Sequence, residues 1–251
     1  MCTASIIPLR PGPAVRVGFN RDESRQRPAA LPPCVRSFGG RRAVLPVDPV
    51  SDGTWIAVND TGLAMMLMNV YPVPFDRKAF AAEARRYASR GAIIPSLLHC
   101  VTLDEAAALA SRLDPARYPA FRLVLLDRRQ WVEILAADGR LTVRGPQLID
   151  KPVMYASSGL GDDRVDPPRR ALFEEMLAAV TDPALMQDAF HRHQWPDGPH
   201  LSVCMSRPEA RTVSLTILEL DAHVSRLIYY PESPDRHPEP VTVELAISRI
   251  P

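Results

Sequence analysis

Two neighbouring apolar runs constrain the fold of this chain most. Residues 54–58 and 63–68 contain almost no charged side chains, and the segment between them, Asn59-Asp60-Thr61-Gly62, has the composition of a tight turn. A strand with one face in water alternates apolar and polar residues, so strands that lack this alternation are buried on both faces. The sequence therefore predicts a buried β-hairpin with a covering layer on each side.

Amphipathic segments supply candidates for these layers. Apolar residues at helical spacing predict helices over residues 75–90, 93–101 and 103–113, and the last begins with a capping box, Thr102…Glu105. Residues 168–180 and 183–191 form a second helical group, in which Leu172, Phe173, Met176, Leu177 and Val180 share one face.

Further strands are predicted on both sides of the helical groups. They cover residues 3–7, 14–19, 43–47, 121–126, 131–136, 141–144, 153–157, 201–205, 212–220, 225–230 and 241–246, and a loop rich in Pro and Gly covers residues 25–40. This order predicts an α+β fold. At 251 residues, we expect one domain over residues 1–251.

The first residues carry a candidate nucleophile. If Met1 is removed, Cys2 has both a thiol and a free α-amine, and an amine that titrates near ~7.7–8.0 can take the proton of a thiol that titrates near ~8.5. If the first two strands form a hairpin through residues 10–13, the second strand brings Asn20, Arg21 and Asp22 beside Cys2.

Composition excludes several classes of protein. Thirty basic and twenty-nine acidic residues nearly cancel, so we expect no nucleic-acid partner. No apolar run reaches the roughly 20 residues of a membrane span, and a signal peptide's pattern is absent, so we expect no membrane insertion and a cytoplasmic location. The four cysteines are widely spaced and predict neither a disulfide scaffold nor a zinc ribbon.

Three short motifs resemble those of a known family. Met1-Cys2, Asn20-Arg21-Asp22-Glu23 with Ser24-Arg25 and Pro28, and Gly53-Thr54-Trp55 with Asn59 and Gly62 are similar to the NRDE family, which includes the transport and Golgi organisation protein 2 homologues. That family belongs to the N-terminal-nucleophile hydrolase superfamily, and the chain is more distantly similar to bile salt hydrolases and penicillin V acylases. The resemblance implies a four-layer αββα sandwich with two mainly antiparallel sheets between helical layers.

The resemblance also implies roles for individual residues. Asp22 would hold the N-terminal amine and the thiol, and Arg21 or Arg16 would orient them. Asn69 would donate to the oxyanion of the tetrahedral intermediate. We assign Cys2, Arg21, Asp22 and Asn69 to catalysis.

A second set of residues is assigned to substrate binding. Ser158 stands near the position of the second oxyanion asparagine of the relatives, and a hydroxyl has a shorter reach than an amide. Arg169 or Arg170, at the start of a helix, could hold a substrate carboxylate or phosphate. We assign Asn20, Arg16, Ser158 and Arg169 to substrate binding.

These features predict a hydrolase that cleaves a small amide, ester or thioester through an acyl-enzyme on Cys2, without a cofactor. The alternative is a non-catalytic protein that binds or carries a hydrophobic ligand such as haem or lipid, which the transport and Golgi organisation branch suggests. His191 and His193 are spaced as in some metal sites. Their segment is loop-like and acyl transfer at Cys2 needs no metal, so we predict no metal site.

Overall fold

A six-stranded antiparallel sheet contains both the first and the last strands of the chain. The computed structural model describes residues 2–12, 14–71, 76, 86–179 and 181–248. The strand order in this sheet is β10-β1-β2-β11-β12-β13. The strands are β1 (Cys2–Leu9), β2 (Ala14–Ser24), β10 (Val153–Ser157), β11 (Ala210–Leu220), β12 (Val224–Tyr230) and β13 (Val241–Ala246).

A seven-stranded antiparallel sheet contains the central part of the chain. Its order follows the sequence, β3-β4-β5-β6-β7-β8-β9. The strands are β3 (Leu31–Phe38), β4 (Arg41–Val47), β5 (Ile56–Asn59), β6 (Ala64–Asn69), β7 (Phe121–Leu126), β8 (Gln130–Ala137) and β9 (Arg140–Leu148). Asn59, Gly62 and Leu63 close the turn between β5 and β6, with a positive φ of 78° at Gly62 that a glycine adopts without strain.

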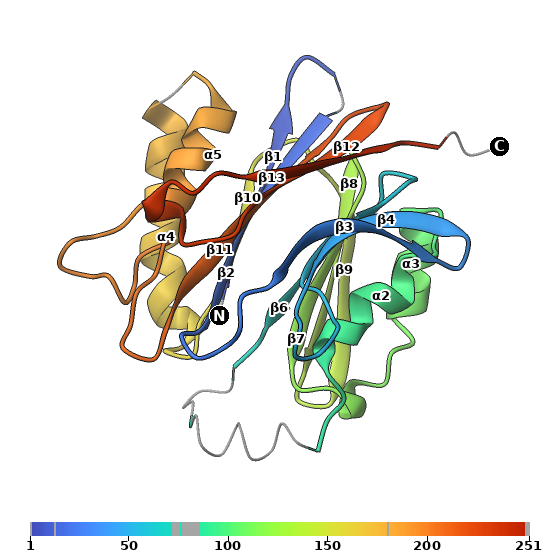
Figure 1. The fold of residues 1–251 in the computed structure, drawn as a ribbon, viewed down its shortest axis with the longest axis horizontal. Coiled ribbons are helices and arrows are strands. Elements are labelled where there is room, and N and C mark those ends of the chain that lie inside the picture. The colour runs from blue at the N-terminus through green and yellow to red at the C-terminus, as the bar shows by residue number, and fades with distance from the viewer. Residues whose placement is uncertain (1, 13, 72–75, 77–85, 180, 249–251) are drawn as a thin grey trace.

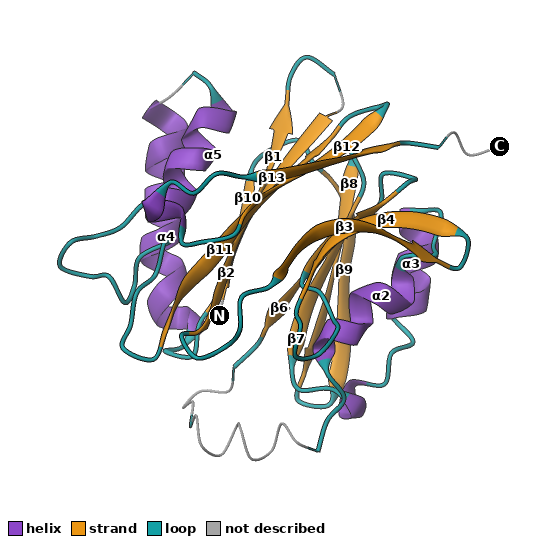
Figure 2. Cartoon of the chain, viewed as in Figure 1, coloured by secondary structure: helices purple, strands orange, loops and turns teal. Residues whose placement is uncertain are grey.

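The two sheets stack face to face between two helical layers (Figures 1 and 2). One layer, α4 (Asp162–Ala179) and α5 (Pro183–Arg192), covers the six-stranded sheet, and the other, α2 (Ile93–Leu97) and α3 (Leu103–Ala110), covers the seven-stranded sheet. Three short 3₁₀ turns, η1 (Arg90–Ala92), η2 (Pro115–Arg117) and η3 (Pro234–Arg236), lie in connections. Within the described residues, no helix combines the length and apolar character needed to cross a membrane.

Apolar side chains fill all three spaces between the four layers. The space between the sheets contains Ala4, Phe19, Val58, Met66 and Val124, which are fully or almost fully buried. A second cluster joins the seven-stranded sheet to α2 and α3, and a third joins β1 and β10 to α4 and α5. Both faces of each sheet are thus buried near its centre, as the lack of alternation in residues 54–58 and 63–68 predicts.

The predicted αββα sandwich is confirmed, and most elements lie where the sequence places them. The capping box is confirmed, since the Thr102 hydroxyl accepts a hydrogen bond from the Glu105 amide at 3.2 Å. Strands β7, β10 and β13 have the predicted bounds. The predicted helix over residues 75–90 falls largely outside the described residues.

Two local predictions are wrong. The predicted loop over residues 25–40 contains β3, an edge strand whose exposed residues and two prolines, Pro32 and Pro33, resemble a loop in composition. The predicted strand over residues 201–205 is an irregular and mostly buried segment, in which Val203 packs in the same apolar cluster as residues of α4 and α5. In addition, α4 begins six residues before the predicted start, with Pro167 and Pro168 inside the helix.

Candidate active site

The β1–β2 hairpin places Cys2 beside the charged end of β2. Cys2 pairs directly with Arg21, and Thr3 pairs with Asn20. On the other side of β1, Cys2 pairs with Ser157 of β10. Residues that are directly opposite in an antiparallel pair project from the same face, so Cys2 and Arg21 both point toward the other sheet. The predicted proximity of Cys2 and Arg21 is therefore confirmed.

Cys2 lines a cavity of about 390 Å³ at one end of the sandwich. The N-terminal end of β1 lies there, across from β6 of the other sheet (Figure 1). Both sheets contribute to the lining: Cys2, Arg21 and Asp22 come from the six-stranded sheet, and Asn69 comes from the end of β6. The four residues assigned to catalysis thus border one space.

Burial determines the protonation state of the Cys2 thiol, the candidate nucleophile. The Cys2 side chain is buried, and this burial raises the pKa of the Cys2 thiol above its ordinary value. The negative charge of Asp22 acts in the same direction, while the Asp22 backbone and the Arg21 guanidinium oppose it. The thiol is therefore neutral near pH 7, and its attack on a carbonyl requires a base next to the sulfur.

Asp22 is a buried carboxylate at the boundary between the cavity and the helical layer. The Thr212 hydroxyl donates to Asp22 Oδ1 at 2.6 Å. Burial raises the pKa of Asp22 above its ordinary value, although the charges of Arg169 and Arg207 and the Thr212 hydrogen bond act in the opposite direction. Arg169, itself buried, donates to Thr3 Oγ1 at 2.5 Å, beside Cys2 in β1.

Arg21 is fixed by two kinds of contact. Its guanidinium lies over the Trp55 ring, 4.3 Å from the centroid, and Nη2 donates to Asp48 Oδ2 at 2.5 Å. Asp48 also accepts two hydrogen bonds from Arg27, at 2.7 and 2.9 Å. Burial raises the pKa of Asp48, but its bonds to Arg27 and the nearby Arg21 charge outweigh burial, so this pKa lies below its ordinary value. Asp48 thus remains a carboxylate that holds Arg21 against Trp55.

Asn69 connects the two sheets at the cavity. Its side-chain amide donates to the Tyr71 hydroxyl at 3.0 Å, and its backbone carbonyl accepts from the Ser157 hydroxyl at 2.5 Å. Ser157 is the β10 residue opposite Cys2. The hydrogen bond between Ser157 and Asn69 therefore links the strand next to the nucleophile to the residue that we assign to the oxyanion.

The residues assigned to substrate binding do not line the Cys2 cavity. Asn20 donates to the backbone carbonyls of His191 and Val203, at 2.8 and 3.0 Å, and is fully buried under α5. Arg16, opposite Ile7 and far along the hairpin from Cys2, pairs with Asp188 at 2.8 Å. Both residues fasten β2 to α5, so their positions support a structural role.

Ser158 and Arg169 are also held inside the protein. The Ser158 hydroxyl accepts from Arg207 at 3.0 Å, and Arg169 donates to the carbonyls of Leu201 and Ser202, at 2.9 and 2.6 Å. Arg169 affects the site through the charge that it places near Asp22. Arg170, the other candidate, pairs with Asp166 on its own helix.

Trp55 and Arg90 are among the cavity residues to which sequence reasoning gave no role. The Trp55 indole N–H is buried and has no hydrogen-bond partner among the described residues. Arg90 comes from η1, and burial lowers its pKa. The Gly53-Thr54-Trp55 motif drew attention to Trp55 in the sequence, but it did not assign a role to this residue. Gly53 is needed there because a Cβ atom would lie 2.6 Å from the Gly91 backbone, next to Arg90.

The two histidines, His191 and His193, contact different parts of the protein. Both ring nitrogens of His191 are hydrogen bonded, Nε2 to Ser5 Oγ at 2.7 Å and Nδ1 to Asn20 Oδ1 at 3.2 Å. His193 contacts Trp195 instead. In the part of the chain that the structure describes, no three His, Cys, Asp or Glu residues are grouped as metal ligands.

Comparisons with known proteins agree with this architecture. A family model described as Transport and Golgi organisation 2 matches residues 12–189. No curated protein matches the sequence significantly. Among solved structures, an N-acylethanolamine-hydrolyzing acid amidase ortholog from Caenorhabditis elegans matches with a TM-score of 0.60 and 13% identity over 86% of this chain and 92% of that one.

A second solved structure is similar over more of this chain. Penicillin V acylase from Agrobacterium tumefaciens matches with a TM-score of 0.56 and 14% identity over 98% of this chain and 87% of that one. At these identities the likeness establishes the fold, which is that of the N-terminal-nucleophile hydrolases.

Proposed function

The chain belongs to the Transport and Golgi organisation 2 family, and we propose that it is an N-terminal cysteine hydrolase. Its reaction would cleave a small amide, ester or thioester through an acyl-enzyme on Cys2. The observation that carries this proposal is that Cys2, Arg21, Asp22 and Asn69, from two sheets, line one cavity. The hydrolase fold supports the same reaction class.

The first half of the reaction forms the acyl-enzyme. Removal of Met1 gives Cys2 a free amine, which takes the proton of the neutral thiol as the sulfur attacks the substrate carbonyl. The carbonyl oxygen becomes an oxyanion, which the side-chain amide of Asn69 and the indole N–H of Trp55 could stabilise, each donor being worth ~10²–10³ in rate. The ammonium then protonates the leaving amine, alcohol or thiol, and a thioester remains on Cys2.

The second half releases the product. A water molecule attacks the thioester while the Cys2 amine takes one of its protons, and collapse of the intermediate returns that proton to the sulfur. The products are a carboxylic acid and the original thiol. Asp22 would position the amine throughout, and Arg21, held by Asp48 and Trp55, would favour the negatively charged sulfur.

One observation favours a second candidate function. Burial raises the pKa of the Cys2 thiol, and a neutral thiol is a poor nucleophile. Unless a base lies next to the sulfur, this favours a non-catalytic role for Cys2. In that case the cavity would bind a hydrophobic ligand such as haem or lipid, and the Cys2 amine would have no role. The two candidates differ in whether Cys2 must be N-terminal.

Intact mass measurement combined with thiol labelling separates these candidates. Cys34 is exposed while Cys2, Cys100 and Cys204 are buried, so a Cys34→Ala variant removes the competing exposed thiol. A small thiol probe should then add one label to a protein that lacks Met1, and Cys2→Ala should abolish this label. Cys100→Ala is the matched control and should keep it. Retention of Met1, or labelling that survives Cys2→Ala, would exclude the hydrolase mechanism.

A further inference from the structure

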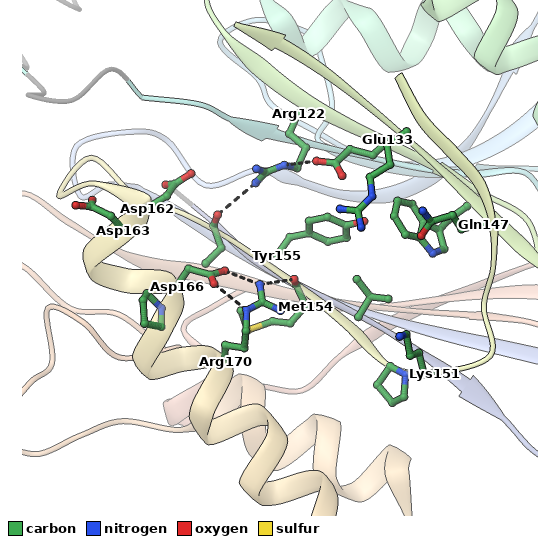
Figure 3. Close-up of a pocket in the computed structure, with 16 residues that line it drawn as sticks. Arg122, Glu133, Gln147, Lys151, Met154, Tyr155, Asp162, Asp163, Asp166 and Arg170 are labelled. Carbon is green, nitrogen blue, oxygen red and sulfur yellow. Dashed lines mark hydrogen bonds and ion pairs between the residues drawn. The ribbon is translucent and has the colours of Figure 1, made fainter. Parts of the chain in front are cut away.

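We propose that the protein has a second binding site, for a small organic carboxylate with an aromatic or apolar body. The site is a cavity of about 640 Å³ that shares no lining residue with the Cys2 cavity (Figure 3). It does not depend on the proposed reaction at Cys2, because none of its lining residues belongs to that mechanism.

The fold forms this cavity where one edge of each sheet meets α4. β10 is the edge strand of the six-stranded sheet, and β9 is the edge strand of the seven-stranded sheet. Arg122 and Glu133 project from the seven-stranded sheet, Tyr155 projects from β10, and Asp166 and Arg170 project from α4 (Figure 3). Strands β7, β8, β9 and β10 and helix α4 thus surround a space that is open at the side of the sandwich.

A buried hydroxyl in this lining has no partner. Tyr155 is 8% exposed, and its hydroxyl has no hydrogen-bond partner among the described residues. The hydroxyl points toward the side of the cavity where Gln147 lies (Figure 3). Burial raises the pKa of Tyr155, so the phenol keeps its proton and can donate it. A buried donor without an acceptor is unfavourable, and a ligand oxygen in the cavity would satisfy it.

The charges of the cavity select the position of a negative group. Arg122 pairs with Glu133 and Arg170 pairs with Asp166, each at 2.8 Å, so these charges are compensated. Arg144 and Lys151 have no ion pair within the described residues, and both line the same cavity. A carboxylate that accepts from the Tyr155 hydroxyl would lie in a cavity whose uncompensated charges, those of Arg144 and Lys151, are positive.

The remaining lining limits the size and charge of the ligand. Asp162 and Asp163 lie at the end of the cavity away from Lys151 (Figure 3), where they would repel a second anionic group. The Trp131 and Tyr155 rings pack edge to face with centroids 6.2 Å apart, next to Val153. These surfaces suit an aromatic or apolar body and disfavour a polyphosphate.

Titration of the full chain with benzoate tests this site. Benzoate should bind saturably, and Tyr155→Phe, which keeps the ring, should weaken binding about tenfold. Lys151→Gln, at an exposed position, should also weaken it severalfold. Arg140→Gln, an exposed arginine on the same strand as Arg144 and outside the cavity, should change nothing.

Two further probes distinguish the chemistry of the ligand. Benzyl alcohol, which lacks the carboxylate, should bind at least tenfold more weakly than benzoate. Inorganic phosphate should not displace benzoate at equal concentration. The proposal is overturned if benzoate does not bind at concentrations on the order of 10 mM, if Tyr155→Phe and Lys151→Gln leave binding unchanged, or if phosphate competes equally.

Discussion

The hydroxyl of Ser157 donates a hydrogen bond to the backbone carbonyl of Asn69 at 2.5 Å. This bond joins β10 of one sheet to the end of β6 of the other, directly beside Cys2. The Arg21–Asp48 and Arg122–Ala156 hydrogen bonds also connect the two sides of the sandwich, and such directed bonds fix the relative position of the sheets more specifically than apolar packing does. The position of Asn69 relative to Cys2 therefore depends in part on this contact.

Ser157→Ala should reduce both stability and Cys2 chemistry. Loss of a buried hydrogen bond should lower the free energy of unfolding by about 1 kcal/mol and leave the Asn69 carbonyl without its donor. Chemical denaturation measures the change in the free energy of unfolding, and the acyl-transfer rate measures the change in Cys2 chemistry. Ser225→Ala is the matched control, because the buried Ser225 hydroxyl has no partner among the described residues. Equal losses in both variants would contradict the role of the Ser157 bond.

Asp22→Asn should separate thiol reactivity from turnover. The negative charge of Asp22 raises the pKa of the Cys2 thiol, so its removal should lower this pKa and increase the thiolate fraction near pH 7. Alkylation by iodoacetamide, in the Cys34→Ala background, should become severalfold faster, while hydrolysis should fall because the proposed positioning of the amine by Asp22 is lost. Exposed Asp104 on α3 provides the control, and Asp104→Asn should change neither rate. Slower alkylation of Asp22→Asn would refute the electrostatic argument.

The sequence predicts the first hairpin, and with it the neighbours of Cys2, because the hairpin depends on local information. Apolar runs on both sides of residues 10–13 define two strands, and their pairing brings Cys2 to Arg21. What it did not predict is that β2 continues through Ser24. Because side chains alternate along a strand, this extension places Arg21 toward the other sheet and Asn20 toward α5. The Asn20-Arg21-Asp22-Glu23 motif therefore supplies both a cavity residue, Arg21, and a residue that holds β2 against α5, Asn20.

Contacts between separate layers could not be predicted from the sequence. Trp55 and Arg90 reach the Cys2 cavity through packing between distant segments, and no local pattern encodes that packing. The same holds for Tyr155, whose apolar neighbours predict a buried strand but not an unsatisfied hydroxyl. β3 was missed because an exposed edge strand with prolines lacks the apolar alternation of an inner strand.

His191 should make the fold sensitive to acid. Because Asn20 Oδ1 is an acceptor, His191 Nδ1 carries the proton, and Nε2 then accepts from the Ser5 hydroxyl. Burial, followed by the charge of Arg16, lowers the pKa of His191 to about 3. The unfolded chain, with an ordinary histidine pKa near ~6.5, therefore binds more protons between these values. The contribution of neutral His191 to the free energy of unfolding is fully present above about pH 6.5. It is lost as the pH falls toward 3, by up to about 1.4 kcal/mol per pH unit.

The His191→Gln variant tests this dependence. Gln cannot be protonated, so it should remove part of the slope of unfolding free energy against pH between 6.5 and 4. His223→Gln, at an exposed position, should keep the slope of the unmodified protein. Identical slopes in all three proteins would show that His191 does not contribute.

Trp55→Phe tests the indole as a donor to the oxyanion. Phe keeps an aromatic face for the Arg21 guanidinium, which lies 4.3 Å from the Trp55 ring centroid, but it removes the unpartnered N–H. If the indole N–H donates to the oxyanion but not to the bound substrate, kcat should fall by ~10²–10³. KM should stay nearly constant, because substrate binding does not use this hydrogen bond. Trp195→Phe, in a loop beside His193, should leave both constants unchanged. A rise in KM with constant kcat would instead assign Trp55 to substrate binding, and the oxyanion would then depend on Asn69.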